Sequence, residues 1–269
     1  MRRLAGRVAL VTGAARGQGR AHALRLAEEG ADLVLLDVCD AVGALGYPPS
    51  TPDDLAETVA LAEAAGAGVV ARQADVRALD AVEAAVAAGT DRFGRLDVVV
   101  ANAGISAWGR LWEITPEQWQ AVLDVNLTGV WHTLRATIPA MIDAGHGGSI
   151  VTISSVAGLK ALPGQAHYSA SKHGLFGLTR TAALELAPYG IRANSVHPWA
   201  VETAMAHDDD LTALLRAERH YLRSFAQVLD EPRVAAPRDI ADAVVWLASD
   251  ESRTVTGVAL PVDLGSTTV

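Results

Sequence analysis

Short apolar runs rich in Val, Leu and Ile recur along the chain, separated by longer helix-like stretches. Such runs are typical of strands buried on both faces of a parallel sheet. Seven runs predict strands at Arg7–Val11, Asp32–Asp37, Gly68–Gln73, Asp97–Ala101, Ser149–Ser154, Ile191–Val196 and Val258–Val262. The intervening patterns predict helices at Gln18–Glu29, Asp53–Ala65, Leu79–Phe93, Pro116–Ala144, Gln165–Ala187 and Arg238–Ser249. The alternation predicts an α/β fold, a doubly wound parallel sheet of the Rossmann type with about seven strands and helices on both faces, in one domain spanning residues 1–269.

Two connections depart from this alternation. Val38–Pro52 is rich in Gly, Pro and Ser and predicts either a flexible surface loop or a loop that covers a ligand. Trp199–Pro237 is a long crossover in which Leu211–Gln227 predicts a helix. The acidic run Asp208–Asp210 fits a solvated surface or a helix N-terminus. Because long insertions at the carboxyl ends of strands usually serve binding, we expect residues 199–237 to form a substrate lid.

The charge and cysteine content narrow the classes of function. The 269 residues include 22 Lys and Arg against 31 Asp and Glu, a net charge of −9, which disfavours nucleic acid and anionic membrane surfaces as partners. No apolar run approaches the length of a membrane span or a signal segment. Cys39 is the single cysteine, and the histidines show no metal-binding spacing. These features predict a cytoplasmic protein without a metal.

A glycine-rich turn, Thr12–Gly19, joins the first predicted strand to the first helix. Glycines at such a turn let the backbone approach a pyrophosphate, whose charge meets the unpaired N–H groups at the helix start. The candidate cofactor-binding residues here are Gly13, Arg16, Gly17, Gln18 and Gly19. A tight turn with no ligand is the alternative interpretation.

Asp37 closes the second predicted strand, where its carboxylate can accept hydrogen bonds from ribose hydroxyls and repel a 2′-phosphate. This favours NAD over NADP, although Arg16 could pair with a 2′-phosphate. Contact between the Asp37 carboxylate and a 2′-phosphate would cost more free energy than pairing of the phosphate with the exposed Arg16 would recover, so we expect NAD. Asp75 and Val76 follow the third strand and could bind the adenine edge or simply begin the next helix.

Tyr168 and Lys172 are four residues apart in a helical pattern, so both side chains project from one face. An ammonium group near a phenol stabilises the phenolate and lowers the tyrosine pKa, which would allow the tyrosine to act as a base near neutral pH. Most pairs with this spacing are ordinary surface pairs, so the interpretation depends on other motifs in the chain.

Five motifs occur in a fixed order: Thr12–Gly19, Ala101–Gly104, Val125–Gly129, Ile153–Ser155 and Tyr168–Lys172. Together they resemble the short-chain dehydrogenase/reductase family, and the resemblance extends from Gly6 to Gly265. It implies that Tyr168 is the general base and that Lys172 lowers its pKa and holds the nicotinamide ribose. It also implies that Ser155 binds the substrate oxygen and that Asn126 anchors a water chain that returns the proton to solvent.

The same resemblance extends the cofactor site beyond the glycine-rich turn. It implies cofactor contacts from Asn102, Ala103, Gly104, Tyr168, Lys172, Pro198, Val201 and Thr203. Members of the family are commonly tetramers packed through their long helices and last strand, so a homotetramer is expected.

Segments 47–59, 71–77 and 260–263 further resemble the carveol dehydrogenase-like, mycofactocin-associated branch of the family. Members of that branch are thought to hold NAD without exchanging it and to pass electrons to a separate acceptor. Our hypothesis from this resemblance is that Val38–Pro52 folds over the cofactor and slows its release, with an external electron acceptor of the mycofactocin type as a candidate partner.

Large apolar side chains lie in the segments expected around the substrate: Trp108, Leu159, Leu162, Trp199, Met205 and Tyr221. They suggest a bulky apolar secondary alcohol such as a terpenoid, although several could instead be core or subunit contacts. We therefore expect an NAD-dependent oxidoreductase that interconverts a secondary alcohol and its ketone. The alternatives are a ketoacyl or sugar reductase of the same family and a catalytically silent NAD-binding redox sensor.

Overall fold

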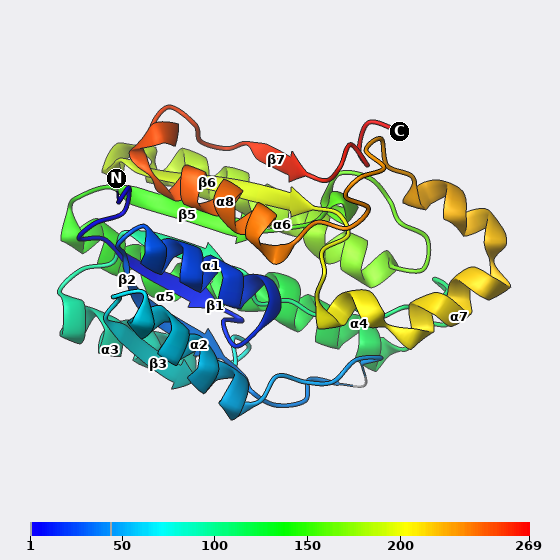
Figure 1. The fold of residues 1–269 in the computed structure, drawn as a ribbon, viewed down its shortest axis with the longest axis horizontal. Coiled ribbons are helices and arrows are strands. Elements are labelled where there is room, and N and C mark those ends of the chain that lie inside the picture. Colours follow the sequence, from blue (N-terminus) through cyan, green and yellow to red (C-terminus); the bar gives the residue numbers. More distant parts are fainter. Residues whose placement is uncertain (1, 44) are drawn as a thin grey trace.

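The computed structural model describes residues 2–43 and 45–269, which form a parallel sheet covered on both faces by helices (Figure 1). The strands lie in the order β3-β2-β1-β4-β5-β6-β7. Their bounds are β1 Val8–Thr12, β2 Asp32–Asp37, β3 Val69–Gln73, β4 Val98–Ala101, β5 Gly148–Ile153, β6 Ile191–Pro198 and β7 Ala259–Val262. All seven predicted strands are confirmed, with small shifts at their ends. The order reverses between β1 and β4, and ligands bind beyond the carboxyl ends of the strands at such a point.

Eight α-helices connect the strands in the described part of the chain. Their bounds are α1 Gly17–Glu28, α2 Pro52–Ala64, α3 Leu79–Phe93, α4 Pro116–Leu123, α5 Gly129–Ala144, α6 Ala166–Leu186, α7 Asp209–Ala217 and α8 Pro237–Ala248. Successive residues of the central strands alternate between two apolar cores: Val11 faces the core shared with α1 and α8, whereas Leu10 faces the core shared with α3, α5 and α6. This two-sided burial is the reason why the strands read as continuous apolar runs.

Two predicted helices are wrong in detail. The helix expected at Pro116–Ala144 is interrupted by a π-helical turn, Asp124–Thr128, between α4 and α5. The helix expected at Leu211–Gln227 is two elements: α7, and a 3₁₀ segment at Arg219–Phe225. Glu218 separates them with a backbone conformation outside the helical region (φ −118°, ψ 65°).

The acidic run at Asp208–Asp210 is a helix N-terminus, one of the two interpretations that the sequence allowed. Asp208 is the N-cap of α7, and its Oδ1 accepts a hydrogen bond from the Asp210 N–H (2.9 Å). Its side chain is buried rather than solvated. Because a carboxylate satisfies the unpaired donors of the first turn, this residue fixes where the lid helix begins.

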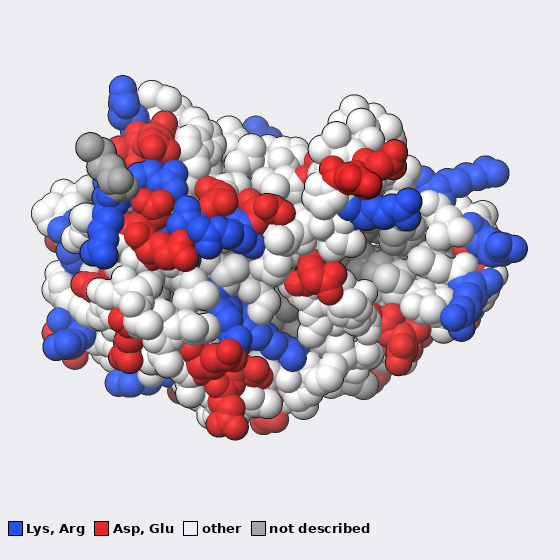
Figure 2. Space-filling model, viewed as in Figure 1, with Lys and Arg blue, Asp and Glu red and all other residues white. Residues whose placement is uncertain are grey.

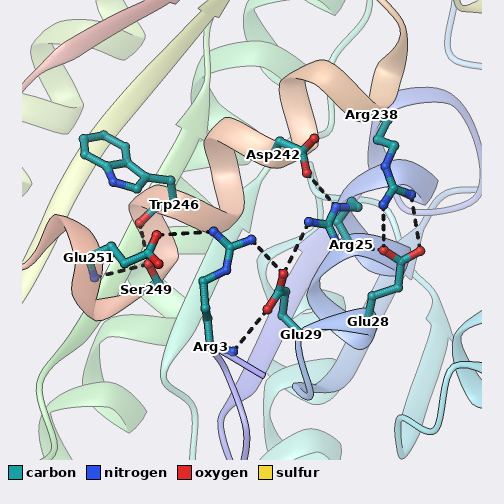
Figure 3. A network of polar contacts seen from close by, with 9 residues as sticks. All are labelled: Arg3, Arg25, Glu28, Glu29, Arg238, Asp242, Trp246, Ser249 and Glu251. Carbon is teal, nitrogen blue, oxygen red and sulfur yellow. Dashed lines mark hydrogen bonds and ion pairs between the residues drawn. The ribbon is translucent and has the colours of Figure 1, made fainter. Parts of the chain in front are cut away.

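A network of ion pairs joins the N-terminal segment to α1 and α8 (Figure 3). Arg25 of α1 binds Glu29 and Asp242, at 3.3 and 2.6 Å, and Arg3 binds Glu29 and Glu251, at 2.7 and 3.3 Å. Figure 2 shows the resulting mixture of acidic and basic groups over α1 and α8. The network ties these two helices together on one face of the sheet, near the C-terminal end of α1.

Candidate active site

The glycine-rich turn packs without space for side chains. A Cβ at Gly19 would lie 1.8 Å from the carbonyl oxygen of Gly13, and a Cβ at Gly13 would lie 2.9 Å from the Cα of Ala103. Gly13 and Gly17 also have left-handed backbones, with φ of +66° and +56°. Asn102 secures the turn, because its Nδ2 donates to the carbonyl oxygen of Thr12 (2.9 Å). The turn therefore presents bare backbone at the carboxyl end of β1.

Asp37, at the end of β2, holds this turn against the following segment. Its Oδ2 accepts a hydrogen bond from the Ala15 N–H (2.9 Å), while its Oδ1 accepts from the Cys39 N–H (3.1 Å) and the Ser50 hydroxyl (2.7 Å). A carboxylate has about four acceptor positions, so one is left for a further donor. Asp37 is buried from bulk solvent but lines a cavity at the carboxyl ends of the strands.

Residues 38–52, one of them outside the described residues, form part of the wall of that cavity. The Tyr47 hydroxyl accepts a hydrogen bond from the Ser106 N–H (3.1 Å), and burial raises the pKa of Tyr47 to about 12. Arg16 of the glycine-rich turn donates to the carbonyl oxygen of Pro48. The segment is thus attached at both sides of the cavity, which fits the covering loop better than the flexible surface loop.

The cavity has a volume of about 400 Å³ and lies at the carboxyl ends of the strands. Fifteen of the predicted site residues line it: Gly13, Arg16, Gly17, Gln18, Gly19, Asp37, Asp75, Val76, Asn102, Ala103, Gly104, Tyr168, Lys172, Thr203 and Met205. Outside the lining are Asn126, Ser155, Pro198, Val201, Trp108, Leu159 and Trp199. The structure thus brings most of the predicted cofactor residues together around one space.

Tyr168 and Lys172 project from the first turns of α6 toward the end of β5. The Lys172 ammonium lies 5.5 Å from the centre of the Tyr168 ring and donates to the carbonyl oxygen of Ile153 (2.8 Å). Ser155 lies two residues beyond the end of β5, and its hydroxyl accepts a hydrogen bond from the Ala157 N–H (3.1 Å). The tyrosine, lysine and serine of the predicted catalytic set are therefore neighbours.

Burial controls the pKa of both ionisable groups. It raises the pKa of Tyr168 to about 12, against the opposite effect of a hydrogen bond to Ser155. It lowers the pKa of Lys172 to about 7. The expected lowering of the tyrosine pKa is therefore wrong for the protein alone. The physical reason is that Lys172 is buried and Tyr168 is mostly buried, which favours the neutral form of each, and the ammonium is directed at a carbonyl oxygen rather than at the phenol.

Asn126 lies in the π-helical turn between α4 and α5. Its Oδ1 accepts a hydrogen bond from the Ile105 N–H (2.8 Å), and its Nδ2 donates to the Ile105 carbonyl (2.9 Å) and to the Ser171 hydroxyl (3.3 Å). A Cβ at Gly104 would lie 3.4 Å from Asn126 Oδ1 and 3.5 Å from the Lys172 Nζ. The asparagine and the lysine thus flank the same glycine, and the widened turn places Asn126 there.

His197 contacts Ser155 and was not among the predicted site residues. Its Nδ1 donates to the Ser155 carbonyl oxygen (2.7 Å), so its Nε2 accepts from the Ser195 hydroxyl (2.8 Å). Burial lowers the pKa of His197 to about 4, which keeps the ring neutral and consistent with this tautomer. In the sequence, its position beside Pro198 at the end of a predicted strand was the only signal.

Trp108 and Trp199 anchor the lid instead of lining the cavity. The ring of Phe225, in the 3₁₀ segment, lies 6.0 Å from that of Trp108 and 5.8 Å from that of Trp199. Trp199 also donates from Nε1 to Gln227 Oε1 (2.9 Å). These contacts agree with the alternative interpretation, in which the large apolar residues pack against one another. Met205 is the predicted substrate residue that does reach the cavity.

The remaining predicted residues lie beside these groups. Val201 is buried and pairs with Ala235 in an isolated bridge, and the Thr203 hydroxyl donates to the Val201 carbonyl oxygen (3.4 Å). Leu162 packs in a small core with Val156. Pro198 ends β6, Leu159 ends a 3₁₀ turn after β5, and Tyr221 lies in the 3₁₀ segment of the lid.

Two further features bear on the class of protein. No cluster of three or more His, Cys, Asp or Glu side chains able to hold a metal occurs among residues 2–43 and 45–269. None of the helices in that part of the chain is long and apolar enough to cross a membrane.

A doubly wound sheet with a bare glycine turn, and a buried Tyr–Lys–Ser group beside it, defines a dinucleotide-dependent oxidoreductase. Comparison with known proteins agrees. A family model described as enoyl-(acyl carrier protein) reductase matches residues 13–267. The chain is 55% identical to an uncharacterised NAD-dependent oxidoreductase of Mycobacterium tuberculosis, over 98% of this chain and 96% of the relative.

Two further relatives are close along their whole length. The (−)-trans-carveol dehydrogenase of Rhodococcus erythropolis is 44% identical, with 99% of both chains covered. The crystal structure of a carveol dehydrogenase from Mycobacterium avium in complex with NAD is 47% identical, with 99% of both chains covered and a TM-score of 0.95. The chain belongs to the short-chain dehydrogenase/reductase family, as the five motifs predicted.

Proposed function

We propose that the protein oxidises a secondary alcohol to its ketone with NAD as the hydride acceptor. The observation that carries this proposal is the position of the Tyr168 hydroxyl, with Ser155 and Lys172 beside it, on a cavity whose other wall is the glycine-rich turn and Asp37. The proposed base and the dinucleotide-binding elements thus face one space. Alcohol oxidation requires this arrangement, because the alcohol oxygen loses a proton to the base while the adjoining carbon loses a hydride to the dinucleotide.

The residues present fit NAD. Gly13, Gly17 and Gly19 leave backbone exposed for a pyrophosphate, and Asp37 has an acceptor position left for a ribose hydroxyl. The Gln18 Oε1 is buried and without a hydrogen-bond partner among the described residues, so a bound donor would satisfy it. Further contacts would come from Asp75, Val76, Asn102, Ala103, Gly104, Lys172, Pro198, Val201 and Thr203. The Asp37 carboxylate disfavours a 2′-phosphate and therefore NADP.

When bound, NAD supplies the ring that accepts the hydride, and the protein manages the proton. Tyr168 Oη accepts the proton of the alcohol, and the Ser155 hydroxyl holds the alcohol oxygen beside it. Since the pKa of Tyr168 is about 12 in the protein alone, the base form needs added positive charge nearby. Protonated Lys172 and the positive charge of oxidised nicotinamide would both favour the phenolate. Asn126, across Gly104 from Lys172, anchors the path by which the proton leaves.

The substrate class that fits best is an apolar cyclic secondary alcohol, for example a terpenoid such as carveol. Apolar side chains line part of the cavity, among them Val42, Leu45, Ile105 and Met205, and the first three pack in one small core with Tyr168. The similarity to carveol dehydrogenases supports the same class. The same similarity favours this class over a ketoacyl or a sugar substrate. A silent redox sensor would have no use for the complete set of Tyr168, Ser155, Lys172 and Asn126.

We further propose that residues 38–52 retain NAD between turnovers and that a separate acceptor of the mycofactocin type receives the electrons. The bonds of Ser50 to Asp37 and of Arg16 to Pro48 would have to break before a dinucleotide could leave past this segment. A homotetramer is the expected assembly, through α4, α5, α6, α8 and β7. The half-exposed Trp131 and the exposed Leu184 on α5 and α6 support it.

The test begins with protein denatured directly after purification and analysis of the supernatant for NAD or NADH. Intact protein is then given carveol and related alcohols, with and without an artificial electron acceptor. Stoichiometric nucleotide and turnover only with the acceptor would support both proposals. Nucleotide-free protein that reduces added NAD would leave the alcohol dehydrogenase proposal standing and refute cofactor retention. No turnover of any secondary alcohol under either condition would refute the proposed function.

A further inference from the structure

A second cavity, of about 390 Å³, lies at the amino ends of the strands. Arg7 precedes β1, Asp97 precedes β4, and Gly148 and Ile191 begin β5 and β6, and all four residues line it. Because the strands are parallel, this cavity is separated from the active site by the full length of the sheet. Nothing in the proposed alcohol oxidation uses it.

The cavity gathers positive charge in an acidic protein. Arg7, Arg95, Arg192 and Arg253 contribute guanidinium groups, against the carboxylates of Asp97 and Asp250 among the other lining residues. Four positive and two negative charges leave a surplus of about two positive charges, whereas the whole chain carries −9. A local field of this sign attracts small anions.

The two carboxylates of this cavity form ion pairs with different arginines. Asp97 is buried and pairs with Arg95 through two bonds, of 2.8 and 2.5 Å. Asp250 is the cavity carboxylate that pairs with Arg7. Both of its oxygens lie 2.7 Å from the Arg7 NH2, and its side chain is 79% exposed. The attraction of Arg7, and of the more distant Arg192 and Arg253, holds the pKa of the Asp250 carboxyl below its usual range. Three arginines therefore share one solvent-facing carboxylate.

Arg192 is fixed in place by uncharged groups. Its NH2 donates to the carbonyl oxygens of Leu247 (2.8 Å) and Ser249 (3.1 Å), and its NH1 donates to the Ser252 hydroxyl (3.0 Å) and the Val255 carbonyl (3.3 Å). These bonds cap the last turn of α8 and hold the guanidinium still. They orient its charge without neutralising it.

Arg253 stands at the rim of the same cavity. Its side chain is exposed and makes no hydrogen bond or ion pair with any other described residue. It could therefore turn toward a ligand at little energetic cost, whereas Arg7 and Arg192 are already oriented by their bonds to the end of α8.

We propose that this cavity is a binding site for a small phosphate-bearing anion, held by Arg7, Arg192 and Arg253. A phosphate group carries close to two negative charges and accepts forked hydrogen bonds from guanidinium groups. Arg7 and Arg253 would supply these donors, whereas Arg192, whose NH1 and NH2 groups already donate to protein oxygens, would supply charge. The anion would compete with Asp250 for Arg7 and would supply the counter-charge that Arg192 lacks.

The test is calorimetric titration of the full chain, saturated with NAD, with inorganic pyrophosphate at low ionic strength. NAD saturation keeps the probe from the active site, and the readout is binding heat rather than activity. We expect one saturable event per chain, weakened by added neutral salt. Arg253→Gln should weaken binding about 10-fold, the loss of one charge-assisted hydrogen bond of about 1.5 kcal/mol.

Matched variants separate a built site from general charge attraction. Arg72→Gln removes an exposed arginine of β3, far from the cavity, and should leave the affinity unchanged. Asp250→Asn removes the competing carboxylate and should tighten binding. The proposal would be overturned by the absence of a saturable event in the wild-type protein, or by equal weakening in Arg253→Gln and Arg72→Gln.

Discussion

The side of the active-site cavity that faces β1 and β2 is built from strand ends and main-chain hydrogen bonds, whereas the side formed by residues 199–237 is built from short helices and aromatic contacts. On the first side, Asp37 bonds to two backbone N–H groups, and the glycine turn has no room for a Cβ. On the second side, Phe225 touches Trp108 and Trp199 by ring contacts alone.

This difference indicates which side of the cavity can change in sequence without loss of the chemistry. The position of the dinucleotide follows from the sheet and cannot move without disturbing buried backbone bonds. The lid meets the rest of the protein mainly through side chains, apart from main-chain bonds of Val228 and Leu229 to the Leu264 carbonyl oxygen, so substitutions there can change the substrate while the chemistry stays in place. We therefore expect changes at the first side and at the catalytic group to abolish function, and changes in the lid to alter substrate affinity.

The largest effect is expected for Tyr168→Phe, which removes the proposed proton acceptor but keeps the ring. Alcohol oxidation should fall by roughly 10² to 10⁴-fold, the usual contribution of a general base. The content of bound NAD should not change, because the glycine turn and Asp37 are untouched. Turnover and nucleotide content measured on the same preparation check both statements. Near wild-type turnover would contradict the assignment of the base.

Gly19→Ala should come next. The new Cβ would fall 1.8 Å from the Gly13 carbonyl oxygen, so the turn must move, and a displacement of about 1 Å can cost roughly 10²-fold. Equilibrium binding of NAD measures the loss. Gly177→Ala, in α6, is the matched control, since its Cβ would meet nothing within 4 Å. If both variants bound NAD equally well, the close packing of the turn would not be needed for the cofactor.

The low pKa of Lys172 makes the free energy of unfolding depend on pH. Its pKa is about 7 in the folded protein and 10.5 in the reference state, so the unfolded chain binds the extra proton between these values. The free energy of unfolding should therefore rise with pH from about 7 toward 10.5 through this group. Denaturant unfolding of NAD-free protein between pH 7 and 9 measures the slope, and Lys172→Met should reduce it. An unchanged slope in the variant would show that burial does not lower the pKa of Lys172.

His197→Ala tests whether the support of Ser155 matters for catalysis. The variant leaves the buried Ser155 carbonyl oxygen without its donor, a cost of about 1–3 kcal/mol. We expect kcat to fall about 10-fold with little change in KM or in NAD content. His197→Asn retains an N–H donor and should recover part of the rate. Equal rates in the alanine variant and the wild type would make His197 a purely structural residue.

The smallest effect is expected in the lid. Phe225→Ala removes two aromatic contacts, each worth about 0.5–1.5 kcal/mol, and should raise KM by several-fold without loss of NAD. Leu222→Ala, a half-exposed residue of the same 3₁₀ segment, serves as the control and should change neither value. A drop in NAD content in Phe225→Ala would mean that the lid holds the cofactor, and the two sides would then not be independent.

The strands, the glycine turn and the Tyr168–Lys172 pair were predictable, because each depends on local sequence rules: two-sided burial of apolar runs, absence of a Cβ, and helical spacing. Most of the predicted cofactor residues consequently meet at one cavity. The π-helical turn that carries Asn126 was not predicted. It depends on a tertiary contact with the Ile105 backbone and leaves no periodicity of its own.

The substrate side was harder to predict, since which lid residues face the cavity depends on how the lid packs. Trp108 and Trp199 are large and apolar, as expected of residues that line a pocket, but their rings pack against Phe225. Met205, in contrast, reaches the cavity. The raised pKa of Tyr168 could not be predicted from the sequence either, because it results from burial, and the sequence does not show how far a side chain is removed from water.

The measurement that tests the central claim most directly is a single turnover of the NAD-bound protein with a secondary alcohol deuterated at its carbinol carbon. The account predicts that the bound nicotinamide acquires the deuterium, at a rate that falls by at least about 10²-fold in Tyr168→Phe. Ketone formation without deuterium on the nicotinamide, or an unchanged rate in the variant, would contradict it.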